Sequence, residues 1–297
     1  MKVEVKKIDA TKRELRFEVS RERVIKKLEE VYQEIGKGAE VKGFRPGKAP
    51  RQVLENRFGK LAQEEMMKKL IPEVYQEAVT KEKLLPIDLP EIKDVSFKDG
   101  MVSFTATMDI KPEVNIKNYK GIKIQKKSSQ VTDEEIGKTI EFFKKGQGQG
   151  KEVPIDDAFA KSLGYSSFQD FRDSLRRQLE IDKDRQNRMD VENQVVEYLL
   201  KNTELVLPES AVKRQQEHLL EDTKQRLRKQ GIKEEDLNKQ ENEMRTELKK
   251  SAERDIKVYF ILDKIAELEN INVEKEENLF HKIIGFLLKE ANWEESK

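Results

Sequence analysis

The spacing of apolar residues changes once along this chain, and that change limits the folds open to it. Before residue 112, several short runs alternate apolar and polar residues, as at Leu15, Phe17 and Val19, which is the period of half-buried strands. After Pro154 a single further proline, Pro208, occurs. The apolar residues there fall at three- and four-residue steps, which indicates amphipathic helices. The fold class predicted is α+β: a small α+β domain with an antiparallel sheet, then an elongated all-α domain.

The first domain is expected to contain two hairpins and two helices. Alternation predicts strand pairs within 2–19 and 95–108. Helical spacing covers 20–35 and resumes over 53–78, with a kink expected at Pro72. Four strands and two helices joined by a protruding loop make one small domain.

The chain is expected to divide into three parts. Residues 1–112 form the N-terminal domain, 113–150 a linker, and 151–297 the helical domain. Within the linker, Thr132–Glu135 matches a capping box at a helix start. Gly146–Gly150 alternates glycine with glutamine and is expected to be a flexible spacer, natural or engineered.

The helical domain carries thin apolar stripes on long helices. Charged residues make up 39% of the chain and hydrophobic residues 36%. A large share of its residues must therefore lie on the surface, in contact with water. A thin stripe means that a helix contacts one neighbour only, which predicts a projecting helical hairpin, or arm, at 209–250. The last helix is expected over 274–291. The alternative is an ordinary helical bundle, in which the surface that packs against these helices is polar.

Composition excludes several classes of chemistry. The chain has no cysteine and two histidines, His218 and His281, which lie far apart in sequence. Neither histidine has metal-ligand spacing, and no glycine-rich phosphate loop is present. We therefore expect no catalytic residues, no metal and no cofactor. The absence of a long apolar run or a secretory signal predicts a cytoplasmic protein with no membrane partner.

Local charge indicates a partner more clearly than net charge, which is +1. Residues 37–60 contain seven lysines and arginines against two glutamates. Such a patch suits one anionic surface, such as ribosomal or other RNA, and nothing indicates DNA. The alternative is a solvated loop.

One short segment inside this patch is specific. It joins an aromatic residue and two cations to turn-forming residues, in the order Gly43, Phe44, Arg45, Pro46, Gly47, Lys48. The glycines allow tight turns, and the proline stiffens the backbone and so lowers the entropy lost on docking. Phe44 offers apolar area, Arg45 can bind phosphate or carboxylate with two parallel bonds, and Lys48 adds a point charge. These residues are the candidate binding site.

The same segment matches the pattern G-F-R-x-G-x-x-P at Gly43, Phe44, Arg45, Gly47 and Pro50. In this the chain resembles the trigger factor family, bacterial chaperones that meet nascent chains at the ribosomal exit tunnel. The resemblance continues through three later segments and so covers most of the chain: Val153–Gly164, Val206–Glu209 and Ile256–Asn270.

The resemblance implies partners for each domain. The loop Gly43–Lys48 would dock on a protein and rRNA of the large ribosomal subunit beside the tunnel exit. The helical domain would form a cradle for nascent and unfolded polypeptides, without ATP. Family members usually carry an isomerase domain of the FK506-binding type, but this chain runs from Lys144 to Lys151 with no room for it. Prolyl isomerase activity is therefore not expected.

Exposed apolar side chains would contact the bound polypeptide. The candidates, each of which also suits a core position, are Phe142, Phe143, Met189, Leu219, Leu220 and Met244. Two other classes remain open: a chaperone or assembly factor that works free in the cytosol, as a homodimer formed through the N-terminal domain, and an RNA-binding module. Binding to ribosomes separates the first of these from a ribosome-associated holdase, and steep salt dependence on naked RNA identifies the second.

Overall fold

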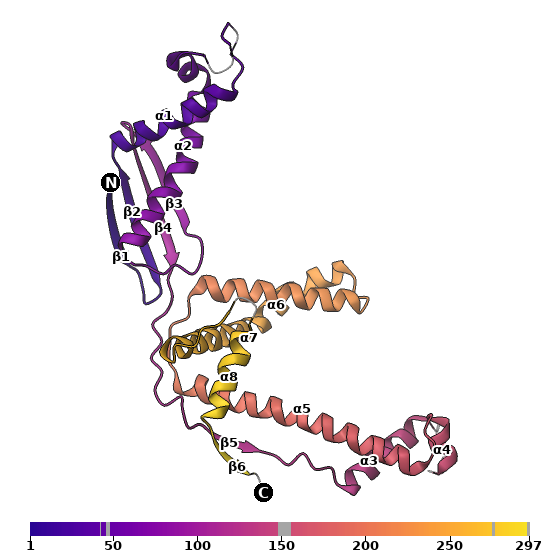
Figure 1. Cartoon of the computed structure of the whole chain (residues 1–297). Coiled ribbons are helices and arrows are strands. Elements are labelled where there is room, and N and C mark those ends of the chain that lie inside the picture. Colours follow the sequence, from indigo (N-terminus) through magenta and orange to yellow (C-terminus); the bar gives the residue numbers. More distant parts are fainter. Residues whose placement is uncertain (42, 46–47, 148–155, 275–276, 296–297) are drawn as a thin grey trace. The chain divides into compact units, whose positions relative to one another are not determined.

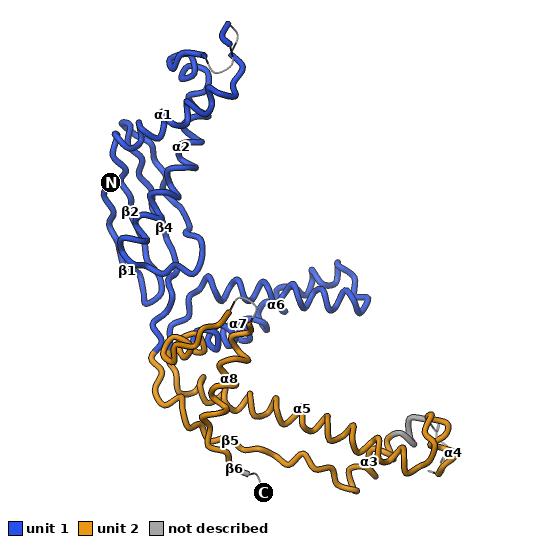
Figure 2. Tube along the Cα trace, in the orientation of Figure 1, with its two compact units in different colours: residues 1–114, 205–260 blue, residues 115–204, 261–297 orange. Residues whose placement is uncertain are grey.

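The computed structural model describes the chain up to Glu295 except at four internal places, residues 42, 46–47, 148–155 and 275–276 (Figure 1). At 143–147 and 295 it describes the backbone only. The chain forms two compact units, each made from segments distant in sequence (Figure 2). Unit 1 comprises residues 1–114 and 205–260, and unit 2 comprises 115–204 and 261–297. The three-part linear division stays a prediction.

Unit 1 begins with a four-stranded antiparallel sheet in the order β1-β2-β4-β3. The first hairpin pairs β1 (Lys2–Lys7) with β2 (Lys12–Val19), and the second pairs β3 (Glu91–Lys98) with β4 (Met101–Asp109). Both hairpins lie where alternation predicts them. The two central strands, β2 and β4, carry the strictest alternation, because both of their edges are paired and one of their faces is buried.

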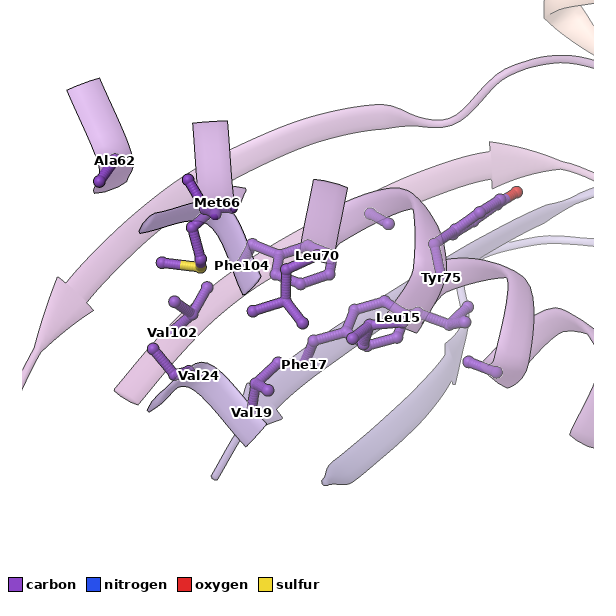
Figure 3. Packing of buried hydrophobic residues seen from close by; sticks show 14 of the residues in the cluster. Leu15, Phe17, Val19, Val24, Ala62, Met66, Leu70, Tyr75, Val102 and Phe104 are labelled. Carbon is purple, nitrogen blue, oxygen red and sulfur yellow. The ribbon is translucent and has the colours of Figure 1, made fainter. Parts of the chain in front are cut away.

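Two helices cover the apolar face of this sheet. They are α1 (Arg21–Gly38) and α2 (Arg51–Lys81), and α2 runs through Pro72 as one helix. Phe17 of β2 and Phe104 of β4 are partners in register and stack with ring centroids 4.4 Å apart. Met66 and Leu70 of α2 pack on the same cluster (Figure 3). The sheet and its two helices, which we call the α/β module, are therefore held by one continuous core.

The second part of unit 1 is a helical hairpin. It pairs α6 (Glu209–Lys229) with the first part of α7 (Glu234–Leu268), and Gly231 makes the turn with a φ of +88°. Its interior holds few apolar side chains, among them Leu220 and Leu237. The thin stripes in the sequence predict this arm correctly.

A buried carboxylate joins the hairpin to the α/β module. Asp109, at the end of β4, accepts the N–H of Ser210 in the first turn of α6 at 2.8 Å. Pro208 occupies the N-cap and has no side-chain oxygen, so Asp109 supplies the acceptor that a capping side chain would normally provide. Arg214 and Asp88 form an ion pair at 3.0 Å in the same region.

Unit 2 is built along the 35-residue helix α5 (Phe168–Asn202). Near its start, α3 (Asp133–Gln147) and α4 (Asp157–Ser162) pack with it around Phe159, Phe171 and Ile136. The capping box is confirmed: Thr132 Oγ1 accepts the N–H of Glu135 at 3.3 Å, and a Glu135 carboxylate oxygen accepts the N–H of Thr132 at 2.9 Å. Helix α3 therefore belongs to a packed unit, although it lies in the segment expected to be a linker.

The end of the chain differs from the sequence prediction. The last helix, α8, covers Leu279–Lys289 rather than 274–291, because Asn278 caps it by accepting the N–H of Phe280 at 2.9 Å. A strand that was not predicted follows, β6 (Asn292–Glu295), and pairs in parallel with β5 (Lys123–Lys126). Unit 2 thus adds a two-stranded sheet to its helices.

Candidate functional site

The predicted binding segment lies in the connection between α1 and α2. Val41 before the segment is buried in the core of the α/β module, and Ala49 after it packs against that core. Two backbone bonds shape the loop: Phe44 N–H donates to the Val41 carbonyl at 3.0 Å, and Lys48 N–H donates to the Arg45 carbonyl at 2.9 Å. The loop is therefore fixed to the module at both ends.

The side chains at the loop face solvent. Phe44 is 40% exposed, and Arg45 and Lys48 are both exposed. Gly43 has a φ of +90°, which favours glycine, and open space lies where a Cβ would stand. Pro46 and Gly47, also predicted to bind, lie outside the described residues. The structure thus brings Phe44, Arg45 and Lys48 together on one short exposed segment.

The cations near this loop fall into two groups. Arg45 and Lys48 have no ion pair within the described part of the chain, nor do three exposed neighbours on α1 and α2, Lys37, Arg57 and Lys60. Their charge is therefore available to an anionic partner.

Arg51 belongs to the other group, although the sequence places it in the same positive patch. It pairs with Glu29 and Glu55, both at 3.1 Å, and its guanidinium lies 3.4 Å from the ring centroid of Tyr32. This arginine fastens the start of α2 to α1. Counting charges along the sequence could not separate it from the cations that have no ion pair among the described residues.

The candidate polypeptide-contact residues differ widely in exposure. Phe142 on α3 is 74% exposed and Met189 on α5 is 52% exposed. Leu219 and Met244 of the arm are half-buried. Leu220 is only 3% exposed and packs inside the hairpin. The side chain of Phe143 lies outside the described part of the chain.

Charged and polar pairs link the two helices of the arm, in addition to its small apolar interior. Across the hairpin, Lys224 Nζ lies 2.6 Å from a carboxylate oxygen of Glu241, and Arg245 pairs with Glu217. Arg245 also pairs with Glu241 of its own helix at 2.9 Å. Gln215 donates to Asp255 at 3.0 Å. The small interior leaves Leu219 and Met244 partly exposed.

No metal-binding cluster of three or more histidine or acidic side chains occurs among the described residues. In the same residues, no helix has both the length and the apolar run that a membrane span requires.

Two family models match the chain. The model described as "Bacterial trigger factor protein (TF)" matches residues 1–143, and that of the trigger factor C-terminus matches residues 167–282. Residues 144–166 lie between the two matches.

Curated relatives extend the similarity. The trigger factor of Natranaerobius thermophilus is 37% identical over 154 residues, which cover 51% of this chain and 34% of that protein, so the match spans about a third of the relative. The trigger factor of Halothermothrix orenii is 26% identical over 377 aligned positions, covering 93% of this chain and 88% of the relative. That alignment is longer than the chain itself, so this relative contains residues with no counterpart here.

A solved structure of the trigger factor chaperone, described with its promiscuous substrate recognition in folding and assembly, matches with a TM-score of 0.58. The match covers 93% of this chain and 87% of the solved chain at 17% identity, a level that shows a shared fold.

Proposed function

The chain belongs to the trigger factor family, and from this premise we propose that it is a ribosome-associated, ATP-independent holdase. The loop Gly43–Lys48 binds the large ribosomal subunit beside the tunnel exit, where protein and rRNA are both within reach. The exposed apolar residues of the helices shield hydrophobic segments of nascent or unfolded chains. The protein works in the cytoplasm.

One observation carries the docking proposal: an exposed aromatic side chain stands beside two cations that have no ion pair within the described chain, on a loop anchored at both ends. Anchoring limits the entropy lost when the loop binds. Arg45 and Lys48 supply charge for phosphate or carboxylate groups, and Phe44 supplies apolar area.

The holdase proposal rests on exposed apolar side chains near charged ones. Phe142 and Met189 are available in unit 2, and Leu219 and Met244 are partly available on the arm. Weak contacts at several such residues allow release as the bound chain buries its own apolar groups. Leu220 takes no part, because it packs inside the hairpin.

We also propose that prolyl isomerisation is not among the activities of this chain. The two family matches leave only residues 144–166 between them, and relatives align over more positions than this chain contains. A segment of that length is too short for a further domain.

Cosedimentation with bacterial ribosomes tests the docking proposal. Wild type should pellet with ribosomes, and the Phe44→Ala, Arg45→Ala double variant should stay in the supernatant. The matched control is Leu89→Ala with Lys98→Ala, which removes an exposed apolar side chain and an exposed cation from around β3 and should pellet like wild type. Failure of the wild type to pellet would favour a chaperone that works free of the ribosome, and its mass in solution would then show whether it is a dimer.

A further inference from the structure

Helix α2 begins just after the loop Gly43–Lys48, and its start lacks the groups that usually stabilise one. Pro50 occupies the N-cap without a side-chain cap bond, and the first turn contains no acidic residue. Arg51, the first residue of the helix, instead places a cation there, which is unfavourable beside the positive end of the helix dipole. The contacts of Arg51 with other residues must therefore offset this cost.

Three groups hold the Arg51 side chain. Its guanidinium lies over the ring of Tyr32, 3.4 Å from the centroid, and pairs with Glu29 and Glu55 at 3.1 Å each. Tyr32 is only 3% exposed and belongs to the core of the α/β module. Tyr32 and Glu29 lie three residues apart on α1 and so share one face of that helix. Arg51 therefore ties the end of the loop to a buried part of α1.

The two helices come close together where the loop leaves α1 and returns to α2. A Cβ at Gly36, near the end of α1, would stand 3.0 Å from Leu54 Cδ1 in the first turn of α2. A pocket of 320 Å³ also lies here, and Tyr32, Ala49 and Arg51 are among its lining residues. Because Ala49 borders this open space, apolar packing does not enclose the second end of the loop completely.

The loop itself has few bonds that fix its shape. In its described part, two backbone hydrogen bonds involve loop amides, that of Phe44 to Val41 and that of Lys48 to Arg45. The side chains of Phe44, Arg45 and Lys48 are exposed. Their arrangement therefore depends on the two ends of the loop, where Val41 is buried on one side and Arg51 is held on the other.

We propose that Arg51 is a positioning residue for ribosome binding. It holds the second end of the loop so that Phe44, Arg45 and Lys48 are presented together, and it does not contact the ribosome itself. Tyr32 covers one face of its guanidinium and two carboxylates already pair with it, so little of its charge is available to a phosphate group. The inference rests on the proposed docking of the loop for its partner.

Hydrogen exchange of the free protein tests whether Arg51 holds the loop. Arg51→Met keeps the apolar stem but removes the guanidinium, and should speed exchange of the Phe44 and Lys48 amides by about threefold or more. Arg23→Met is the matched control, because Arg23 in the first turn of α1 also ties α1 to α2, through Glu73. It should leave the two loop amides unchanged. Unchanged exchange of these amides in Arg51→Met would overturn the proposal.

Ribosome affinity measured over a range of salt concentrations tests how Arg51 acts. Arg51→Met should weaken binding by about threefold or more, while the slope of log affinity against log salt stays that of wild type, because no phosphate contact is lost. Glu29→Gln should weaken binding too, since it removes a bond that holds Arg51. Arg51→Lys keeps the charge but loses the planar fork, so it should not restore wild-type affinity. Arg23→Met should bind like wild type.

A direct phosphate contact of Arg51 gives different results and would overturn the proposal. Arg51→Met would then lower the salt slope by about 1, Glu29→Gln would strengthen binding by freeing the cation, and Arg51→Lys would keep most of the affinity. An equal loss of binding in Arg23→Met would also overturn it, because the loss would then reflect general stability. Failure of the wild type to bind ribosomes would defeat the docking proposal alone, since the loop amides still decide whether Arg51 holds the loop.

Discussion

The α/β module and the arm of unit 1 are stabilised in different ways. The module buries a continuous cluster that includes Phe17, Met66, Leu70 and Phe104, and most of its charged residues are on the surface. The arm buries fewer large apolar side chains, and exposed charged pairs such as Arg245–Glu217 link its helices. Burial contributes about 1.5–3 kcal/mol for each large apolar side chain, whereas an exposed ion pair contributes about 0–1 kcal/mol. The module should therefore be the stable platform and the arm the easily opened part.

The largest loss of stability is expected from a substitution in the core of the α/β module. Phe17→Ala removes a ring that stacks on Phe104 and should lower the free energy of unfolding by about 3–5 kcal/mol. Urea unfolding followed by circular dichroism measures it. Phe44→Ala also removes a phenyl ring, but from the exposed loop, and should lower the free energy of unfolding by less than about 0.5 kcal/mol. A loss at Phe44 comparable to that at Phe17 would mean that the loop is structural.

A smaller effect is expected where the arm meets the module. Asp109→Ala removes the acceptor for the N–H of Ser210 and should cost about 1 kcal/mol. Hydrogen exchange should become faster in the first turn of α6 and stay unchanged in β2. Glu4→Ala, which removes an exposed carboxylate from the same sheet, is the control. Unchanged exchange in α6 would show that Asp109 does not hold the arm.

The ion pairs of the arm should contribute less to stability than the bond between Asp109 and Ser210. Arg245→Met keeps the apolar stem but removes the charge that pairs with Glu217 and Glu241, so the arm should lose about 0.5 kcal/mol. Because salt screens exposed pairs, that loss should shrink in high salt, whereas the loss in Phe17→Ala should not. Limited proteolysis of the arm at two salt concentrations measures the difference. A salt-independent loss would contradict an electrostatic role.

Acid should weaken the packing of α1 on α2 slightly. Lys27 and Arg23 lower the pKa of Glu73, and Arg23 lowers the pKa of Glu77, both from an ordinary value of 4.5. A lowered carboxyl pKa gives stability that is complete above pH 4.5 and is lost as the pH falls through the lowered pKa values. Both glutamates are partly exposed, so the effect should be small. Glu73→Gln with Glu77→Gln should flatten the pH dependence of unfolding in that range, and an unchanged slope would contradict this.

Local patterns explain how much of this fold can be predicted from the sequence. Alternation places the four strands of the module, and thin helical stripes place the arm, because each depends on neighbours close in sequence. The pairing of β5 with β6 joins residues 123–126 to 292–295. No local signal in a four-residue strand specifies a partner so distant, and apolar residues up to Leu288 favour extending the helix instead.

The sequence motif predicts where the site lies, but it predicts only part of the pairing and exposure of the side chains there. The spacing Gly43-Phe44-Arg45 identifies the loop, and exposure of Phe44 follows from its position between two helices. Sequence spacing could suggest the pair of Arg51 with Glu55 on the same helix, but not its pair with Glu29, which lies on another helix. Nor could it separate Leu219 from Leu220, since one helical step of about 100° decides which of two adjacent leucines is buried.

In the proposed function, the loop binds the ribosome and the helices bind the emerging chain. A photo-crosslinking residue placed at Phe44 or at Phe142 tests it directly on stalled translating ribosomes and on empty ones. We predict that the probe at Phe44 labels a ribosomal component on both, whereas the probe at Phe142 labels the nascent chain on translating ribosomes only. Labelling of the nascent chain from Phe44 with none of the ribosome would contradict the account.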